Sequence, residues 1–207
     1  MMRIALSGLD GTGKSTLVSE LEKHFKEQGK RVKMFHLFSK GQTVMARAQD
    51  SGLLRGLVKW IRGRKDGFFG RGLKFWARFI NVIIDSYITQ RRNNQLALDV
   101  ILYDRYFYDV LLAVIRDFPE KKSLAYAVGR RLPRPDHVFF LDAKPETVIA
   151  RKPEHTLESA QLYRSLYREM AEVLNISILD AEQPEKNVLE QALKQCDPGS
   201  QANVTTI

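Results

Sequence analysis

Short apolar runs alternate along the chain with amphipathic stretches, in the order typical of a parallel sheet covered by helices on both faces. The runs expected to form strands cover residues 3–6, 31–38, 99–103, 137–142 and 176–179. The stretches with helical periodicity cover residues 16–27, 73–95, 108–116, 124–131, 145–151, 157–174 and 184–195. We therefore expect an α/β fold of three layers, with a five-stranded parallel sheet between helices.

The longest expected helix, over residues 73–95, is assigned from large apolar side chains at helical spacing, namely Trp76, Ile80, Ile83 and Tyr87. Residues 40–72 directly before it are rich in glycine and basic residues, and we expect an insert there. A chain of 207 residues suits one substantial core better than two. We expect a single domain over residues 1–196, followed by a flexible polar tail over residues 197–207.

Composition narrows the cellular setting. The hydrophobic content of 44% is typical of a globular protein. The sequence contains no 18-residue apolar run, so it does not predict a transmembrane helix. The apolar stretch at the N-terminus is too short for a signal peptide. The single cysteine, Cys196, cannot form a disulfide framework within the chain, which is consistent with a reducing compartment. We expect a cytoplasmic protein.

Residues 8–15 carry the strongest chemical signal, because Gly-Leu-Asp-Gly-Thr-Gly-Lys-Ser matches the phosphate-loop pattern G-x-x-x-x-G-K-[ST]. An expected strand precedes the loop and an expected helix follows it, as the motif requires. Glycines let backbone amides wrap a phosphate group at a helix N-terminus. The pattern predicts nucleoside triphosphate binding, with Lys14 on the β- and γ-phosphates and Ser15 on Mg²⁺. The alternative is an ordinary glycine turn with a solvated lysine.

Polar residues also follow the other expected strands, at Asp104, Asp142 and Asp180. Ligands of open parallel sheets collect outside the carboxyl ends of the strands. Asp104 is therefore the candidate to hold Mg²⁺ through water, and the planar guanidinium of Arg105 is suited to grip a phosphate. The alternative is that Asp104 caps the next helix and pairs with Arg105; a structural role is favoured more strongly for the other two carboxylates.

With these residues in view, the chain resembles the thymidylate kinase family of nucleoside-monophosphate kinases. The resemblance rests on residues 8–16, on Val-Ile-Leu-Tyr-Asp-Arg-Tyr at 100–106, on Arg-Pro-Asp-His-Val-Phe-Phe-Leu-Asp at 134–142 with Pro145, Glu146 and Arg151, and on Ile-Leu-Asp-Ala at 178–181. These motifs follow the family's order over most of residues 2–195. The resemblance implies a P-loop kinase fold with a short lid over about residues 151–160.

The resemblance also implies transfer of the γ-phosphoryl group of ATP, with Mg²⁺, to a nucleoside monophosphate, dTMP giving dTDP. The implied catalytic residues are Lys14, Arg105 and Arg151, and the implied metal-binding residues are Ser15 and Asp104. ATP binding is implied for Gly8, Gly11, Thr12, Gly13, Lys14, Ser15, Thr16, Arg151 and Ala181, the last beside the adenine. Acceptor binding is implied for Asp10, Phe75, Arg78, Arg105 and Tyr106, with Asp10 on the sugar hydroxyl and Arg105 on the phosphate. A homodimer is also compatible with the resemblance.

The departures from the family pattern lie almost entirely on the acceptor side. The Arg-Glu-Pro-Gly stretch after the second strand is missing, and Phe75 and Arg78 are three residues apart rather than four. Asp109 replaces a serine, and Ala113-Val114 replaces a Tyr-Gln pair. The acceptor could therefore be another nucleotide, a nucleoside, or a membrane- or polysaccharide-linked group. On the donor side, the phosphate loop lacks an arginine, and a lid cation would have to replace it; the candidates are Lys152, His155 and Arg164.

A third reading is a non-catalytic, nucleotide-dependent regulatory module. The joint presence of Lys14, Ser15, Asp104, Arg105 and Arg151 argues against it, because binding alone needs no acceptor-side arginine. The chain has no Asn-Lys-x-Asp sequence for reading guanine, which argues against a GTPase.

The net charge of +9 is concentrated in residues 40–80, which contain ten Lys or Arg and only two acidic residues. Within this segment, Leu53, Leu54, Leu57, Val58 and Ile61 share one helical face, opposite Arg55, Lys59 and Arg62. A basic amphipathic helix of this kind predicts peripheral contact with an anionic membrane surface through residues 53–65. The alternative is that the helix packs over the acceptor pocket with its cations in water. Nucleic-acid binding is disfavoured, since no recognised module is present.

Overall fold

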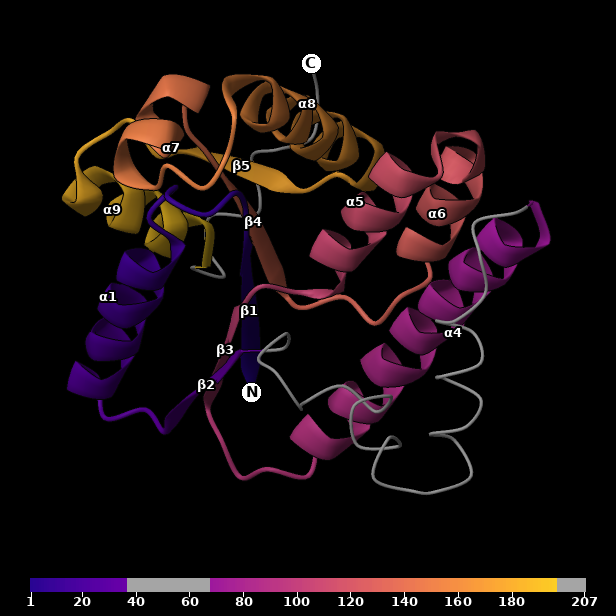
Figure 1. Cartoon of the computed structure of the whole chain (residues 1–207). Coiled ribbons are helices and arrows are strands. Elements are labelled where there is room, and N and C mark those ends of the chain that lie inside the picture. The colour runs from indigo at the N-terminus through magenta and orange to yellow at the C-terminus, as the bar shows by residue number, and fades with distance from the viewer. Residues whose placement is uncertain (37–67, 197–207) are drawn as a thin grey trace, which may run out of the picture. The chain divides into compact units, whose positions relative to one another are not determined.

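Five strands form the sheet of the computed structural model, which describes residues 1–36 and 68–196 (Figure 1). The strand order is β2-β3-β1-β4-β5, and the strands are parallel. Their bounds are β1 Met2–Ser7, β2 Val32–His36, β3 Val100–Asp104, β4 His137–Asp142 and β5 Ser177–Asp180. These bounds agree with the five runs expected from the sequence, and the prediction of a five-stranded parallel sheet is confirmed.

The central strand β1 fixes where functional groups can gather. Ile4, Ala5 and Leu6 are fully buried, as expected for a strand covered on both faces. Leu6 pairs in register with Asp104 of β3, and Ser7 of β1 pairs with residue 140 of β4. Because the strands are parallel, the residues after β1, β3 and β4 emerge at one edge of the sheet.

The helices also follow the periodicity of the sequence. Their bounds are α1 Lys14–Glu27, α4 Phe68–Asn93, α5 Phe107–Asp117, α6 Lys122–Gly129, α7 Pro145–Arg151, α8 Leu157–Leu174 and α9 Glu185–Cys196. Most ends fall within two residues of the expected positions. A short 3₁₀ turn, η1 Pro119–Lys121, was not expected, and α4 begins inside the expected insert.

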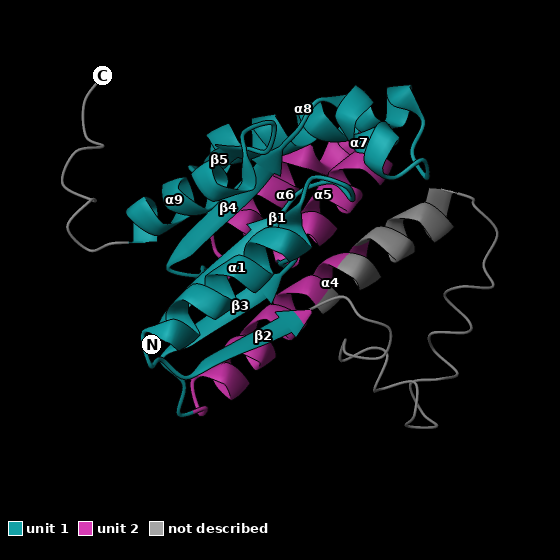
Figure 2. Cartoon of the chain, turned by 90° about the vertical axis from the view of Figure 1, so that its left-hand side faces the viewer, with its two compact units in different colours: residues 1–35, 97–106, 134–207 teal, residues 36–96, 107–133 magenta. Residues whose placement is uncertain are grey.

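The chain divides into two compact units (Figure 2). The first comprises residues 1–35, 97–106 and 134–207, and it contains the sheet with α1, α7, α8 and α9. Within it, α1 packs against α9, and α8 packs against β4 and β5. The second comprises residues 36–96 and 107–133, where α5 contacts both α4 and α6. The phosphate loop and the ends of all five strands, except the last residue of β2, belong to the first unit.

In α4, helical spacing predicted the conformation but not the side that is covered. Three of the four residues from which the helix was assigned, Trp76, Ile80 and Tyr87, are each about half exposed, at 51%, 50% and 53%. Among the side chains of α4 that the structure describes, the buried apolar ones are Phe79 and Val82. This helix carries apolar residues on more than one side, and periodicity alone does not say which side meets a neighbour.

Two expectations fall outside the described residues. These are the basic segment over residues 53–65 and the tail over residues 197–207. Within residues 1–36 and 68–196, no helix has the length and hydropathy needed to cross a membrane.

Candidate active site

The loop after β1 depends on glycine at three positions. Gly8, Gly11 and Gly13 have φ angles of +147°, +94° and +89°, a region that L side chains rarely adopt. A Cβ on Gly8 would also lie 2.8 Å from the carbonyl oxygen of Leu141 in β4. The loop therefore runs close against the end of β4, and Gly13 leads directly into the N-terminus of α1.

Side chains of the loop point back into it. Thr12 Oγ1 donates a hydrogen bond of 2.8 Å to the carbonyl oxygen of Leu9, and Lys14 Nζ donates one of 2.6 Å to the same oxygen. Lys14 is only 5% exposed, and its Nζ lies 3.7 Å from Asp10 Oδ1. A buried ammonium group is thus held at the loop beside the helix N-terminus, where anions are favoured.

Two side-chain oxygens, from Ser15 and Asp104, meet beside the phosphate loop. Ser15 Oγ donates to Asp104 Oδ2 at 3.4 Å, and the Asp104 side chain is almost fully buried at the end of β3. Mg²⁺ is usually held by one or two protein oxygens together with substrate phosphates and water. This pair fits that chemistry. Among the residues that the structure describes, no three His, Cys, Asp or Glu side chains form a closed metal site.

Arg105 is held in an unusual conformation beside the loop. Its φ of +71° is rare for a residue other than glycine. Its backbone N donates to the carbonyl oxygen of Leu6 at 2.9 Å, and its guanidinium pairs with the carboxylate of Asp10. Burial alone raises the pKa of Asp10, but nearby cations outweigh it and hold the pKa below its usual value; they are Arg105, Lys14 and Lys152. Asp10 is therefore a carboxylate at neutral pH.

A cavity of about 240 Å³ opens beside the loop, on the side of α1 and α9. The predicted nucleotide-binding residues on its wall are Gly11, Thr12, Gly13, Thr16, Arg151 and Ala181. Arg151 is the last residue of α7 and lies on this cavity, where its NH1 donates to the carbonyl oxygen of Gly11 at 3.3 Å. Drug-sized ligands need about 300–1,000 Å³, so this space suits part of a nucleotide, such as its base.

The wall around Ala181 is a turn held by hydrogen bonds. The Ala181 backbone N donates to the Asp142 carbonyl oxygen at 2.8 Å. The Asp180 carboxylate accepts from the backbone N of Glu182 at 3.0 Å and from Gln183 Nε2 at 3.2 Å. Asp180 thus stabilises the turn that lines the cavity.

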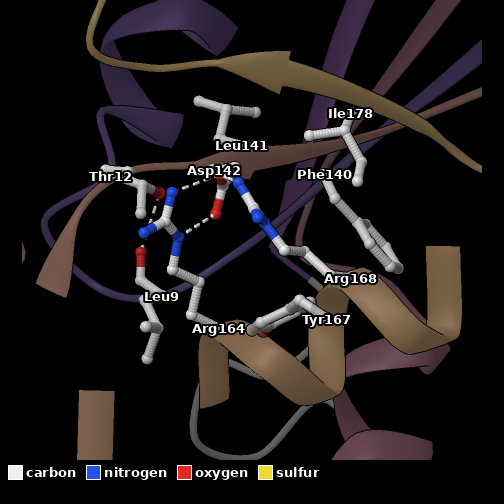
Figure 3. Close-up of a pocket in the computed structure, with 10 residues that line it drawn as sticks. Leu9, Thr12, Phe140, Leu141, Asp142, Arg164, Tyr167, Arg168 and Ile178 are labelled. Atoms are coloured by element: carbon white, nitrogen blue, oxygen red, sulfur yellow. Dashed lines mark hydrogen bonds and ion pairs between the residues drawn. The ribbon is translucent and has the colours of Figure 1, made fainter. Parts of the chain in front are cut away.

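Asp142 has a structural partnership as well. Figure 3 shows Arg164 and Arg168 pointing from α8 toward its carboxylate, beside a water-sized cavity of about 10 Å³. Arg164 Nε and NH2 donate at 2.7 and 2.8 Å, and Arg168 NH2 donates at 2.6 Å. Burial raises the pKa of Asp142, but these hydrogen bonds outweigh it and lower the pKa overall. Asp142 therefore anchors α8 to the end of β4.

The remaining predicted acceptor-binding residues are Tyr106, Phe75 and Arg78. Tyr106 is buried, with its ring 5.2 Å from that of Tyr103. Phe75 and Arg78 lie on α4 in the second compact unit, and their side chains are outside the described part of the structure. A larger groove of about 900 Å³ is lined by the starts of β1, β3 and β4, and none of the predicted site residues borders it.

Some contacts at the site had no signal in the sequence. The Glu182 carboxylate accepts from the backbone N of Lys144 and from Thr147 Oγ1 at the start of α7. Arg168 joins Arg164 on Asp142. A charged residue on an exposed turn or helix belongs to no motif, and only the arrangement of the elements reveals its partner.

Known proteins provide an independent comparison. The family described as Thymidylate kinase matches residues 6–192. A probable thymidylate kinase 1 from Saccharolobus solfataricus is 25% identical over 202 residues, which cover 92% of this chain and 94% of that protein.

The fold is also found among solved structures. A structure of deoxyadenosine kinase from M. mycoides, with the products dCMP and a flexible dCDP bound, has a TM-score of 0.56 and 17% identity; the match covers 94% of this chain and 98% of that one. This likeness supports the P-loop kinase fold. The match over nearly the whole chain shows that the protein belongs to the thymidylate kinase family and is a phosphotransferase of the P-loop kinase type.

Proposed function

We propose that this chain transfers the γ-phosphoryl group of ATP to a nucleoside monophosphate, with dTMP as the first acceptor to test. The observation that carries the proposal is the meeting of two sets of groups in one compact unit. Lys14 and Ser15 come from the phosphate loop and α1, while Asp104 and Arg105 come from the end of β3. The phosphate loop can hold the phosphates of the donor, and the Arg105 guanidinium beside it can hold the phosphate of the acceptor. This arrangement suits transfer of a phosphoryl group from one phosphate to another.

On the donor side, the amides around Gly11 to Ser15 bind the phosphates, and Lys14 neutralises the charge on the β- and γ-phosphates. The adenine then occupies the cavity beside Ala181. Arg151, on the same cavity, exchanges its weak contact with the Gly11 carbonyl oxygen for a phosphate oxygen. Mg²⁺, bound through the Ser15 and Asp104 oxygens, would supply positive charge to the transferring group.

On the acceptor side, Arg105 holds the monophosphate so that one of its oxygens attacks the γ-phosphorus in line. The new phosphorus–oxygen bond forms as the bond to the β–γ bridging oxygen breaks, and ADP leaves. Asp10, ionised and paired with Arg105, both orients that guanidinium and accepts a hydrogen bond from the acceptor sugar.

The phosphate loop has no arginine, and Lys152 is the best-placed lid cation. Its Cβ lies 3.5 Å from where a Cβ on Gly11 would be. Its charge is one of those that hold the pKa of Asp10 low against the opposing effect of burial. We assign Lys152 to the transferring phosphoryl group, where a cation stabilises the negative charge of the transition state.

The other two lid candidates are less well placed. Arg164 donates two hydrogen bonds to Asp142, which direct its guanidinium to the end of β4. The ring of His155 packs edge-on against Tyr163, and among the described residues its buried Nε2 has no hydrogen-bond partner.

A different acceptor for the same chemistry remains the second candidate. The observation that favours it is the missing Arg-Glu-Pro-Gly stretch after β2, together with Asp109, Ala113 and Val114 at altered family positions. These changes leave the donor site intact. They remove groups with which the family pattern recognises thymidylate.

The decisive experiment is a coupled ADP-release screen with Mg²⁺ and ATP across nucleoside monophosphates, nucleosides and sugar phosphates. We expect release that depends on a nucleoside monophosphate, with dTMP among the active acceptors. Lys14→Ala should abolish it, whereas Lys23→Ala, an exposed charge on the same helix, should not. A response only to nucleosides or sugar phosphates would transfer the proposal to the second candidate. ATP binding without release for any acceptor would support a regulatory module instead.

A further inference from the structure

Glu182 joins two parts of the nucleotide site that are distant in sequence. It directly follows Ala181, which lies on the wall of the 240 Å³ cavity proposed to take the adenine, called the base cavity below. Its Oε1 accepts from the backbone N of Lys144 at 2.9 Å, and its Oε2 accepts from Thr147 Oγ1 at 3.1 Å. One carboxylate oxygen therefore binds the residue just before α7, and the other binds the first turn of that helix.

The turn that carries Glu182 is itself held by hydrogen bonds. The Asp180 side chain accepts from the Glu182 backbone N, and the Ala181 backbone N donates to the Asp142 carbonyl oxygen. These bonds tie the turn to the ends of β4 and β5. A ligand that presses on this turn acts directly on the residue that holds α7.

The helix that Glu182 contacts, α7, is short and ends at the phosphate loop. α7 has seven residues, and the residue before it, Lys144, makes no capping hydrogen bond through its own side chain. A helix of this length is unstable alone, so its position depends on its tertiary contacts, those at its first turn among them. Its last residue, Arg151, reaches Gly11 of the phosphate loop.

We propose that Glu182 is a positioning residue that couples occupation of the base cavity to the placement of Arg151 over the ATP phosphates. The inference rests on the proposed function, in that Arg151 contacts those phosphates. The neighbouring helix α8 has its own anchor, because Arg164 and Arg168 bind Asp142. Loss of Glu182 is therefore expected to loosen the first turn of α7, and so to shift Arg151, while α8 stays in place.

The kinetic test compares Glu182→Ala with Glu182→Gln, which keeps an acceptor for the Lys144 amide. Glu182→Ala should lower kcat about ten- to a hundredfold, since small displacements of a positioned group have effects of this size. Its KM for the acceptor should stay near the wild-type value, and Glu182→Gln should recover most of kcat. Glu190→Ala, an exposed glutamate on α9, is the matched control and should behave as the wild type. Equal loss in the alanine and glutamine variants would overturn the inference.

A double-mutant cycle shows whether Glu182 acts through Arg151. If it does, Glu182→Ala should cost little further activity in the Arg151→Ala background, because coupled residues are non-additive. Additive losses would overturn the coupling. This outcome differs from a failure of the proposed function, in which the wild type transfers phosphate to no acceptor.

Hydrogen exchange provides a readout that needs no acceptor. ADP should slow exchange of the α7 amides in the wild type and in Glu182→Gln, but much less in Glu182→Ala. In the free protein, the Lys144 amide should exchange faster in Glu182→Ala. If ADP does not protect α7 in the wild type, or protects it equally in Glu182→Ala, the inference is wrong even where kinase activity is found.

Discussion

Arg105 is a residue whose backbone is strained while its side chain is held in a defined direction. A non-glycine residue at φ of +71° costs about 1–2 kcal/mol. The Leu6 carbonyl oxygen holds its backbone, and Asp10 holds its guanidinium. Strained residues of this kind cluster at functional sites, where the surrounding structure fixes them.

Two substitutions separate the strain of Arg105 from its chemistry. Arg105→Ala keeps the unfavourable backbone, whereas Arg105→Gly adopts it freely and should be the more stable variant by about 1 kcal/mol. Both should lower phosphoryl transfer by about a hundredfold or more, as expected when a charge-stabilising group is lost. ATP affinity, measured by calorimetry, should change little.

The matched control is Arg31→Ala, because Arg31 pairs with Asp99 on the surface at the start of β2. It should leave transfer unchanged. Loss of ATP affinity as large as the loss of transfer would move Arg105 from the acceptor side to the donor side.

Residue chemistry could be predicted only where a short motif carries it. The spacing of the phosphate-loop pattern predicted Lys14 and Ser15 as site residues, and the end of an apolar strand predicted Asp104 with its neighbour Arg105. The partners of Asp142 and Glu182 could not be predicted. Their hydrogen bonds join segments many residues apart, and depend on how α7 and α8 return to the sheet.

At the scale of elements, the phosphate loop is shaped by its close approach to β4. Gly8 combines an unusual φ of +147° with a Cβ position 2.8 Å from a backbone oxygen. Gly29, after α1, has a φ of +74° but nothing within 4 Å of its Cβ position. A side chain at Gly29 would therefore meet only backbone strain, whereas one at Gly8 would also collide with the backbone of β4.

Gly29→Ala should cost about 1 kcal/mol of unfolding free energy from backbone strain alone. Gly8→Ala should cost at least about 2 kcal/mol, because the backbone of β4 must also shift. Chemical denaturation of both variants measures the difference. Equal destabilisation would show that the loop does not press against β4.

The anchor between α8 and β4 predicts a dependence of stability on pH. The folded-state pKa of Asp142 lies below its usual value of 3.8, because the hydrogen bonds of Arg164 and Arg168 outweigh the effect of burial. A lowered carboxyl pKa contributes stability above the unfolded pKa, and this contribution is lost as the pH falls through the folded pKa.

Asp142→Asn should therefore destabilise the protein at neutral pH, by about 1–3 kcal/mol for lost hydrogen bonds to a charged group. The difference from the wild type should shrink as the pH falls below 3.8. Thermal unfolding over this range is the measurement, with Glu172→Gln as control, because Glu172 is an exposed carboxylate on α8, the helix that carries Arg164 and Arg168. A difference that is constant with pH would exclude the ion pairs as its source.

Element order and type could be predicted well, because strands with continuous apolar runs and helices with amphipathic spacing leave strong patterns. Which side of α4 is buried could not be predicted. Phe79 is buried while Trp76 and Ile80 are half exposed, although all three are large and apolar. Which side of a helix is covered depends on its neighbours in space, and spacing within the helix does not contain that information.

For the whole molecule, the uneven charge is the feature that the active site leaves unexplained. The first compact unit contains the donor-site and Arg105 groups. Residues 40–80 contribute +8 of the net charge of +9, counted as ten basic minus two acidic residues. Surface binding of basic segments to anionic lipids gains about 1 kcal/mol per Lys or Arg.

We predict that the protein sediments with anionic lipid vesicles at low salt and is released as salt is raised, since screening weakens the attraction. Neutral vesicles should not retain it. Replacing Arg55, Lys59 and Arg62 together by Gln should weaken binding without loss of ADP affinity. Absence of binding to anionic vesicles at low salt would exclude the membrane reading and favour solvated cations.

The most direct test of the central claim follows the phosphoryl group itself. With ATP labelled on its γ-phosphate, Mg²⁺ and dTMP, we expect the label in the nucleoside diphosphate, and its loss in Lys14→Ala and Arg105→Ala. Label that appears only in inorganic phosphate, for dTMP and every other acceptor tried, would contradict the account.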